Sequence, residues 1–145
     1  MIKVSPMLTF RGQAGQALKL YEEAFNTVVE VKMTYADAGK KGFEYKEEEK
    51  DFIYYSQLSI GGQAIMVSDD PVDALDDNTK GKSDKPFLVD LVVEFDSDDI
   101  LKSAYDKMAE GATITQPLHS PHYCSLCVVF VDRFGGRWQF LGYGK

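Results

Sequence analysis

Two glycine pairs, Gly61-Gly62 and Gly135-Gly136, constrain the fold of this chain more than any other feature. Each pair separates two short runs of strand-forming residues, 52–60 from 63–69 in the first case and 123–131 from 137–142 in the second. Glycine adopts the positive φ angles that a two-residue hairpin turn requires. The sequence therefore predicts two β-hairpins, and their similarity predicts that the chain repeats one structural unit.

The segments in front of the two hairpins also repeat. In the first half, a short apolar segment at 4–10 and a β-branched run at 28–35 flank an amphipathic pattern that predicts a helix. Its apolar stripe consists of Ala14, Ala17, Leu18, Tyr21, Ala24 and Phe25. In the second half, strands at 87–95 and 113–116 flank a helix that begins after the capping pair Asp96-Ser97 and ends at Gly111. The stripe of this helix consists of Ile100, Leu101, Ala104, Tyr105 and Met108.

The element order β-α-β-β-β is thus predicted twice, which places the chain in the α+β class. The first βαβββ module covers about 1–70, the second covers about 87–145, and the polar segment at about 71–86 is the predicted linker. The Gly-, Lys- and Glu-rich residues 36–51 are expected to form a solvated loop. Because each module alone would leave one sheet face bare, we expect a single domain with a curved mixed sheet around a central cup and helices on its convex side.

The net negative charge of the chain argues against some classes of binding partner. The 145 residues carry a net charge of −7, which argues against nucleic acids and anionic membrane surfaces as ligands. The sequence contains neither an apolar run long enough to span a bilayer nor a charged-then-apolar leader, so we expect a cytoplasmic protein. The two cysteines provide no disulfide framework.

Several segments, in this order, resemble the vicinal-oxygen-chelate superfamily of glyoxalases, bleomycin-resistance proteins and dioxygenases. More narrowly, the chain resembles the PhnB-like branch, often labelled 3-demethylubiquinone-9 3-methyltransferase. The matching segments are Pro6-Met-Leu-Thr-Phe-Arg-Gly12, Ala17-Leu-Lys-Leu-Tyr-Glu-Glu-Ala-Phe25, residues 60–69, Pro117-Leu118 and residues 132–138. The methyltransferase label lacks support in the sequence, because no glycine-rich cofactor loop follows the first strand.

A two-residue turn at each glycine pair predicts which strand residues face the cup. At Gly135-Gly136 it places Val128, Phe130, Asp132, Gln139 and Leu141 inside, with Trp138 and Phe140 against the helices. At Gly61-Gly62 it places Tyr54, Ser56, Leu58, Ile65, Val67 and Asp69 inside. The predicted ligand-binding residues are Tyr54, Asp69, Asp90, Tyr123, Phe130, Gln139 and Leu141. A bulge of one residue would exchange the two faces.

The resemblance implies a divalent metal as cofactor, held by side chains of four strands. The corresponding positions here are Ser5, Ile65 or Val67, Asp90 and Gln139. Asp90 is a good ligand, Gln139 a weak one and Ser5 a poor one, and the two aliphatic residues cannot coordinate a metal. We therefore expect the usual metal site to be missing, with Asp90 and Gln139 as the candidate ligands if a metal does bind.

A second cluster, His119-Ser-Pro-His122-Tyr-Cys124-Ser-Leu-Cys127, has the residue types of a zinc site. On the predicted strand, Cys124 and Cys127 would point to opposite faces, and no helix start follows them to activate a thiol. Buried, unreactive cysteines are the favoured interpretation. His119 and His122 are interpreted as surface residues, with a general acid or base at the cup mouth as the alternative.

The sequence names no reaction and does not decide whether the protein is an enzyme. The leading hypothesis is a small-molecule-binding protein with an apolar, aromatic-rimmed cup and no usual metal site. One alternative is a metal-dependent lyase, isomerase or dioxygenase, and another is a drug-sequestering resistance protein whose acidic surface suits a cationic drug. The resemblance also implies a homodimer.

Overall fold

The computed structural model describes residues 1–71 and 89–144. The chain divides into two compact units, Met1–Pro86 and Phe87–Lys145, each of which is described by itself. The predicted linker at 71–86 and the first residues of the strand expected at 87–95 lie outside the described residues, except Pro71.

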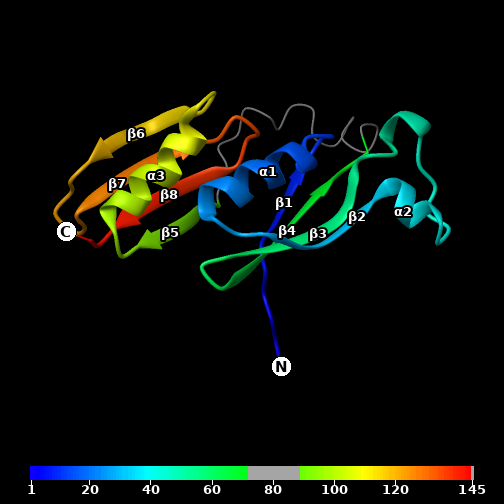
Figure 1. Cartoon of the computed structure of the whole chain (residues 1–145), viewed down its shortest axis with the longest axis horizontal. Helices are drawn as coiled ribbons and strands as arrows, with labels where there is room; N and C mark the ends of the chain where they lie inside the picture. Colours follow the sequence, from blue (N-terminus) through cyan, green and yellow to red (C-terminus); the bar gives the residue numbers. More distant parts are fainter. Residues whose placement is uncertain (72–88, 145) are drawn as a thin grey trace. The chain divides into compact units, whose positions relative to one another are not determined.

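The first unit is a four-stranded mixed sheet with a helix on one face. Its sheet has the order β1-β4-β3-β2, in which β1 is parallel to β4 and the other neighbours are antiparallel. The elements are β1 (Met7–Phe10), α1 (Ala14–Phe25), β2 (Val29–Thr34), α2 (Tyr35–Gly39), the 3-10 helix η1 (Glu47–Glu49), β3 (Ile53–Ile60) and β4 (Gln63–Asp69). Figure 1 shows the unit, with its N-terminal residues extending away from β1.

The second unit repeats this topology. Its sheet has the order β5-β8-β7-β6, with β5 parallel to β8 and the other neighbours antiparallel. The elements are β5 (Leu91–Phe95), α3 (Asp98–Ala109), β6 (Thr113–His119), β7 (Leu126–Val131) and β8 (Arg137–Gly142). The predicted repetition of one βαβββ module and the α+β class are thus confirmed.

Helix α1 packs its small and aromatic residues against β3 and β4. The predicted stripe is confirmed for Ala14, Ala17, Leu18, Tyr21 and Ala24, which are buried. The capping group at its start comes from β4: Asp69 Oδ1 accepts hydrogen bonds from the backbone N–H groups of Gly12 (2.8 Å) and Ala14 (3.0 Å). A carboxylate is favourable there because the first N–H groups of a helix have no partners within it.

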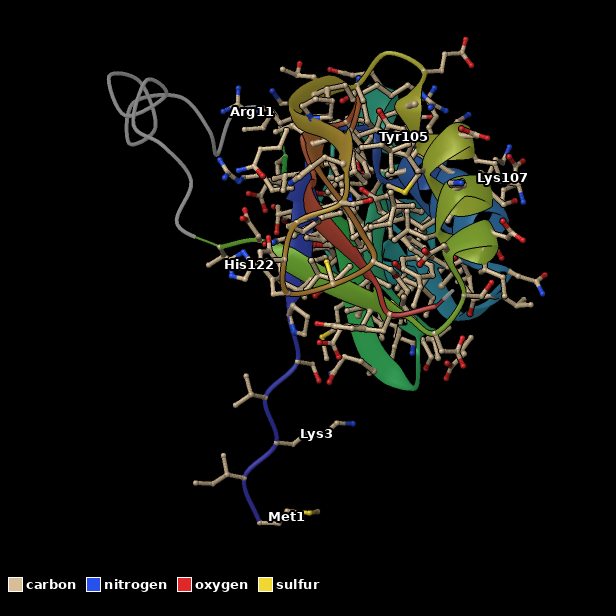
Figure 2. All side chains as sticks on the ribbon, turned by 90° about the vertical axis from the view of Figure 1, so that its left-hand side faces the viewer. Met1, Lys3, Arg11, Tyr105, Lys107 and His122 are labelled. Carbon is tan, nitrogen blue, oxygen red and sulfur yellow. The ribbon has the colours of Figure 1, made fainter. Side chains whose placement is uncertain are left out.

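Helix α3 begins at the predicted cap, where the Ser97 hydroxyl accepts from the Ile100 N–H at 3.3 Å. Leu101, Ala104 and Met108 are buried, whereas the side chain of Ile100, predicted in the stripe, is 59% exposed. Figure 2 shows Tyr105 on the strand side of this helix and Lys107 on its outer side. The Tyr105 ring contacts Phe130 of β7 edge-on at a centroid distance of 5.5 Å, so this face of the sheet is the one that α3 covers.

Residues 36–51 are more ordered than the predicted solvated loop. Thr34 and Asp37 form a reciprocal capping box that starts α2, and η1 follows. The rings of Tyr35 and Phe43 lie 5.1 Å apart, and Phe43 also contacts Tyr54 at 4.8 Å. The composition of this segment is polar, but its few aromatic residues give it a small core of its own.

The first predicted hairpin turn is confirmed. Ile60 pairs with Gln63, and both Gly61 (φ 58°) and Gly62 (φ 81°) have positive φ, as a type I′ turn requires. Leu58 pairs with Ile65, which is the register that the two-residue turn predicts.

The second predicted hairpin turn is wrong. Asp132 N–H donates to the Gly136 carbonyl and Gly135 N–H donates to the Asp132 carbonyl, so three residues form the loop, with Gly135 alone at positive φ. Asp132 is buried and stabilises this loop, because its Oδ1 accepts from the N–H groups of Phe134 and Gly136 and its Oδ2 from Trp138 Nε1. Phe130 consequently pairs with Trp138 rather than with Leu141. The register of β7 against β8 is therefore shifted by three residues from the predicted one. Because side chains alternate between the two faces of a sheet, an odd shift places Phe130 on the same face as Trp138 and not on the face of Leu141.

None of the helices in the described ranges is both long and apolar enough to cross a membrane.

Candidate functional site

Each sheet has one face that its helix covers and one face that its helix leaves uncovered, which we call the open face. We define the open face of the second sheet by the residues that alternate with the helix-facing Trp138, Phe140 and Phe130. These residues are Val92, Glu94, Cys127, Val129, Val131, Arg137, Gln139 and Leu141, of which Cys127 is fully buried. Val129, Gln139 and Leu141 are half-buried and the Val92 side chain is 53% exposed, so this face presents apolar surface with a few polar groups, as small-molecule sites do.

An ion pair lies at one end of this face. Arg137 Nε donates to Asp90 Oδ1 at 2.6 Å, and both side chains are about 30% exposed (28% and 30%). Arg137 is two residues from Gln139 on the same strand, so the two side chains lie on the same face. Sequence reasoning placed Asp90 and Gln139 in the site but missed Arg137. The alternation of Arg137 with Gln139 in β8 was the signal that could have identified it.

Two tyrosines lie at the other end. The Tyr123 hydroxyl is 3.9 Å from Cys127 Sγ, and this hydrogen bond raises the pKa of Tyr123. The Tyr143 hydroxyl is 3.5 Å from Glu94 Oε1, and desolvation, followed by the negative charge of Glu94, raises the pKa of Tyr143. Glu94, Phe95, Asp96 and Tyr143 line an open hollow of about 390 Å³. Both tyrosines therefore act as neutral hydrogen-bonding groups at neutral pH.

Three of the predicted site residues have other surroundings. Phe130 is 1% exposed and packs against Tyr105 and Phe140, so the prediction that it faces the cup is wrong; the three-residue loop is the reason. Asp69 is 5% exposed, and its Oδ2 accepts from the Ile53 N–H at 2.9 Å while its Oδ1 caps α1. Tyr54 contacts Phe43 in the aromatic cluster beside α2.

In the first unit the predicted inner face is also the helix-covered one, although the turn was predicted correctly. Ser56, Leu58, Ile65 and Val67 are buried on the same side as Asp69, which caps α1. The prediction that these residues face the cup is therefore wrong in the first unit, because they face α1. The open face instead carries Met7, Tyr55, Gln57 and Met66.

The donor set does not fit a divalent metal at the position that the resemblance implies. Ile65 and Val67 are aliphatic and face the helix, and the carboxylate of Asp90 is already paired with Arg137, whose positive charge opposes a nearby cation. The amide oxygen of Gln139 and the hydroxyl of Ser5 are each weak metal ligands. Across residues 1–71 and 89–144, no group of three or more His, Cys, Asp or Glu side chains is arranged to hold a metal ion.

The His/Cys cluster is spread over a strand end and a turn. His119 ends β6, and its Nδ1 lies 2.7 Å from the Pro117 carbonyl oxygen. The exposed His122 contacts the Tyr123 ring edge-on at 5.4 Å and is labelled in Figure 2. Cys124 lies in the bend before β7 and Cys127 in β7, and both cysteines are free.

No protein-family model and no curated protein matches the sequence. Solved structures do match. The protein PA1353 of Pseudomonas aeruginosa has 21% sequence identity and a TM-score of 0.79, and the match covers 100% of both chains. The PhnB protein of Bacillus cereus has 20% identity and a TM-score of 0.75, with 97% of this chain and 99% of that chain covered.

Two further structural neighbours are proteins of named classes. A glyoxylase/bleomycin resistance protein/dioxygenase domain from Frankia has 16% identity and a TM-score of 0.63 over 99% and 98% of the two chains. The fosfomycin resistance protein FosX of Listeria monocytogenes, in complex with Mn(II), has 11% identity and a TM-score of 0.61 over 97% and 93%. A divalent metal thus occurs on this fold. The chain has the fold of the vicinal-oxygen-chelate superfamily, as the resemblance predicted, and its structural neighbours include a PhnB protein.

Proposed function

We propose that this protein is a PhnB-like member of the vicinal-oxygen-chelate superfamily that binds a small molecule on the open face of the second sheet without the usual metal site. The observation that carries the proposal is the half-buried row Arg137, Gln139 and Leu141 on β8, opposite Val129 on β7. Leu141 and Val129 offer apolar contact, whereas Gln139 and the Asp90–Arg137 pair orient polar groups of the ligand. Of the predicted residues, Asp90, Tyr123, Gln139 and Leu141 stay in the proposed site.

Binding can be tested with anilinonaphthalene sulfonate, whose rings match the apolar part of this face and whose sulfonate accepts hydrogen bonds. We expect saturable binding with one site per chain. Leu141→Ser and Gln139→Ala should each weaken it at least about fivefold, which corresponds to roughly 1 kcal/mol. Ile100→Ser is the matched control, because this side chain is exposed on α3, outside the open face. Equal affinity in all variants would refute the location of the site.

The proposed lack of the usual metal site can be tested by metal analysis and by thermal unfolding. Elemental analysis of the purified protein should find well under one equivalent of metal. Zn²⁺, Ni²⁺, Mn²⁺ and EDTA should leave the melting temperature unchanged. Stoichiometric metal that is lost in Asp90→Ala would contradict this and establish a metal site on the fold, as in the Mn(II) complex of FosX.

We also propose a homodimer. β1 is an edge strand that pairs only with β4 in its sheet, and its Met7 side chain is 50% exposed. Exposed sheet edges pair readily with a second chain. Analytical ultracentrifugation of the wild type and of a Met7→Lys variant tests this, since the variant should be monomeric; a wild-type monomer would contradict the proposal.

A further inference from the structure

The bend before β7 brings a cysteine sulfur back to the strand that carries the second cysteine. β7 begins at Leu126, so Cys124 is not part of the strand, and the expectation that the two cysteines point to opposite faces of one strand does not hold. Cys124 Sγ donates to the Leu126 carbonyl oxygen at 3.3 Å. Because that carbonyl shares its peptide bond with the nitrogen of Cys127, the Cys124 sulfur lies against the peptide group of Cys127.

The bend is held in place between the two cysteines. Ser125 N–H donates to the Gly142 carbonyl at 2.8 Å. The Ser125 hydroxyl lies 2.7 Å from both that carbonyl and Asp98 Oδ1. These contacts tie the turn to β8 and to the start of α3, so Cys124 is kept close to β7.

The two thiols differ in access. Cys127 is fully buried, and the hydroxyl of Tyr123 lies 3.9 Å from its sulfur. Cys124 is half-buried. A small oxidant can therefore reach Cys124 but not Cys127, and a partially exposed thiol next to a protected one is an arrangement in which the first reacts and the second resolves.

We propose that Cys124 and Cys127 form a reversible intramolecular disulfide when the protein meets a hydroperoxide. The Cys124 thiolate attacks hydrogen peroxide; an S–O bond forms, the O–O bond breaks, and the leaving hydroxide takes up a proton as water. The Cys127 sulfur then attacks the sulfenic acid; the S–S bond forms, the S–O bond breaks, and the departing hydroxide leaves as water with the Cys127 proton. Two thiols are oxidised by two electrons and one peroxide is reduced to two waters. In this reaction the Tyr123 hydroxyl loses its hydrogen bond to the Cys127 thiol.

Intact-mass spectrometry of the full chain after peroxide treatment tests the proposal. We expect the loss of two hydrogen atoms from the monomer, recovered with dithiothreitol. Cleavage by chymotrypsin after Leu126 separates the two cysteines, so their peptides should stay joined until reduction. Joined peptides from a single chain support the disulfide, whereas an unchanged mass, a Cys124 sulfenic acid that persists in the wild type with no disulfide formed, or a disulfide between chains overturns it.

Single variants assign the order of the two steps. In Cys127→Ala the sulfenic acid at Cys124 cannot be resolved, so dimedone should trap it. In Cys124→Ser the buried Cys127 should keep its thiol under the same treatment. Thiol titration of each variant, native and in urea, verifies that Cys127 is protected by the fold, and rapid oxidation of Cys127 in native Cys124→Ser would contradict the proposed order.

Discussion

Replacing Asp69 by asparagine tests whether one buried carboxylate joins α1 to the β3–β4 hairpin. Asp69 accepts three backbone hydrogen bonds, from Gly12 and Ala14 at one oxygen and from Ile53 at the other. In Asp69→Asn the amide oxygen can keep the first two, but the NH₂ group would then meet the Ile53 N–H, and two donors would face each other. The change exchanges atoms of nearly equal size, so packing is preserved and the effect reports on the hydrogen bonds of Asp69 and on its charge at the start of α1.

The magnitude follows from the bond that is lost. A hydrogen bond to a charged group contributes about 1.5–3 kcal/mol, and a buried donor left without a partner costs about 1–3 kcal/mol. Because these two contributions overlap, we expect Asp69→Asn to lower the free energy of unfolding by about 2–4 kcal/mol.

Urea denaturation followed by far-UV circular dichroism measures this loss, and amide hydrogen exchange locates it at Ala14 and Ile53. Asp51→Asn is the matched control, since Asp51 is exposed and lies two residues from Ile53 in the chain. A loss below about 0.5 kcal/mol, with Ile53 exchange unchanged, would refute the reasoning.

Three further perturbations have defined outcomes. Burial, with the nearby Asp69 charge, raises the pKa of Tyr35 to about 12, so the folded state holds this proton longer than the unfolded state. Stability is therefore complete below pH about 10 and falls towards pH 12 by up to about 3 kcal/mol, and Tyr35→Phe should flatten this alkaline loss in urea titrations. Phe130→Ala should cost about 3–5 kcal/mol by fluorescence-monitored unfolding, and Leu141→Ala clearly less; equal costs would contradict the assigned faces. Gly61→Ala, at positive φ, should lower the melting temperature by roughly the equivalent of 1 kcal/mol, whereas Gly15→Ala in α1 should raise it, and the same sign for both would be inconsistent with the turn.

The repeated architecture could be predicted because its signals are local. The first glycine pair, most residues of both helix stripes and the Ser97 cap act over a few residues, and the structure places them in the expected elements. The second turn failed for a local reason as well: Asp132 followed three residues later by Gly135 is typical of a type I turn with a following positive-φ residue, and this pattern outweighed the glycine pair.

The site could be predicted only in part, because its geometry depends on partners far along the chain. Asp69 reads as a polar residue at a strand end, and only the fold brings it to Ala14, 55 positions away. Asp90 has the chemistry of a metal ligand, yet Arg137, 47 positions away, pairs with it. Which face a helix covers is likewise decided by packing across the unit, so an alternating pattern leaves the choice of face open.

The bond from Asp69 to the start of α1 has a consequence for synthesis. On the ribosome the 12 residues of this helix emerge before β4, because the acceptor for the Gly12 N–H follows 57 positions later. A helix of this length is marginal in water without tertiary support. Helix α1 should therefore stay frayed until the hairpin arrives, which makes it a segment that chaperones and proteases can reach during translation.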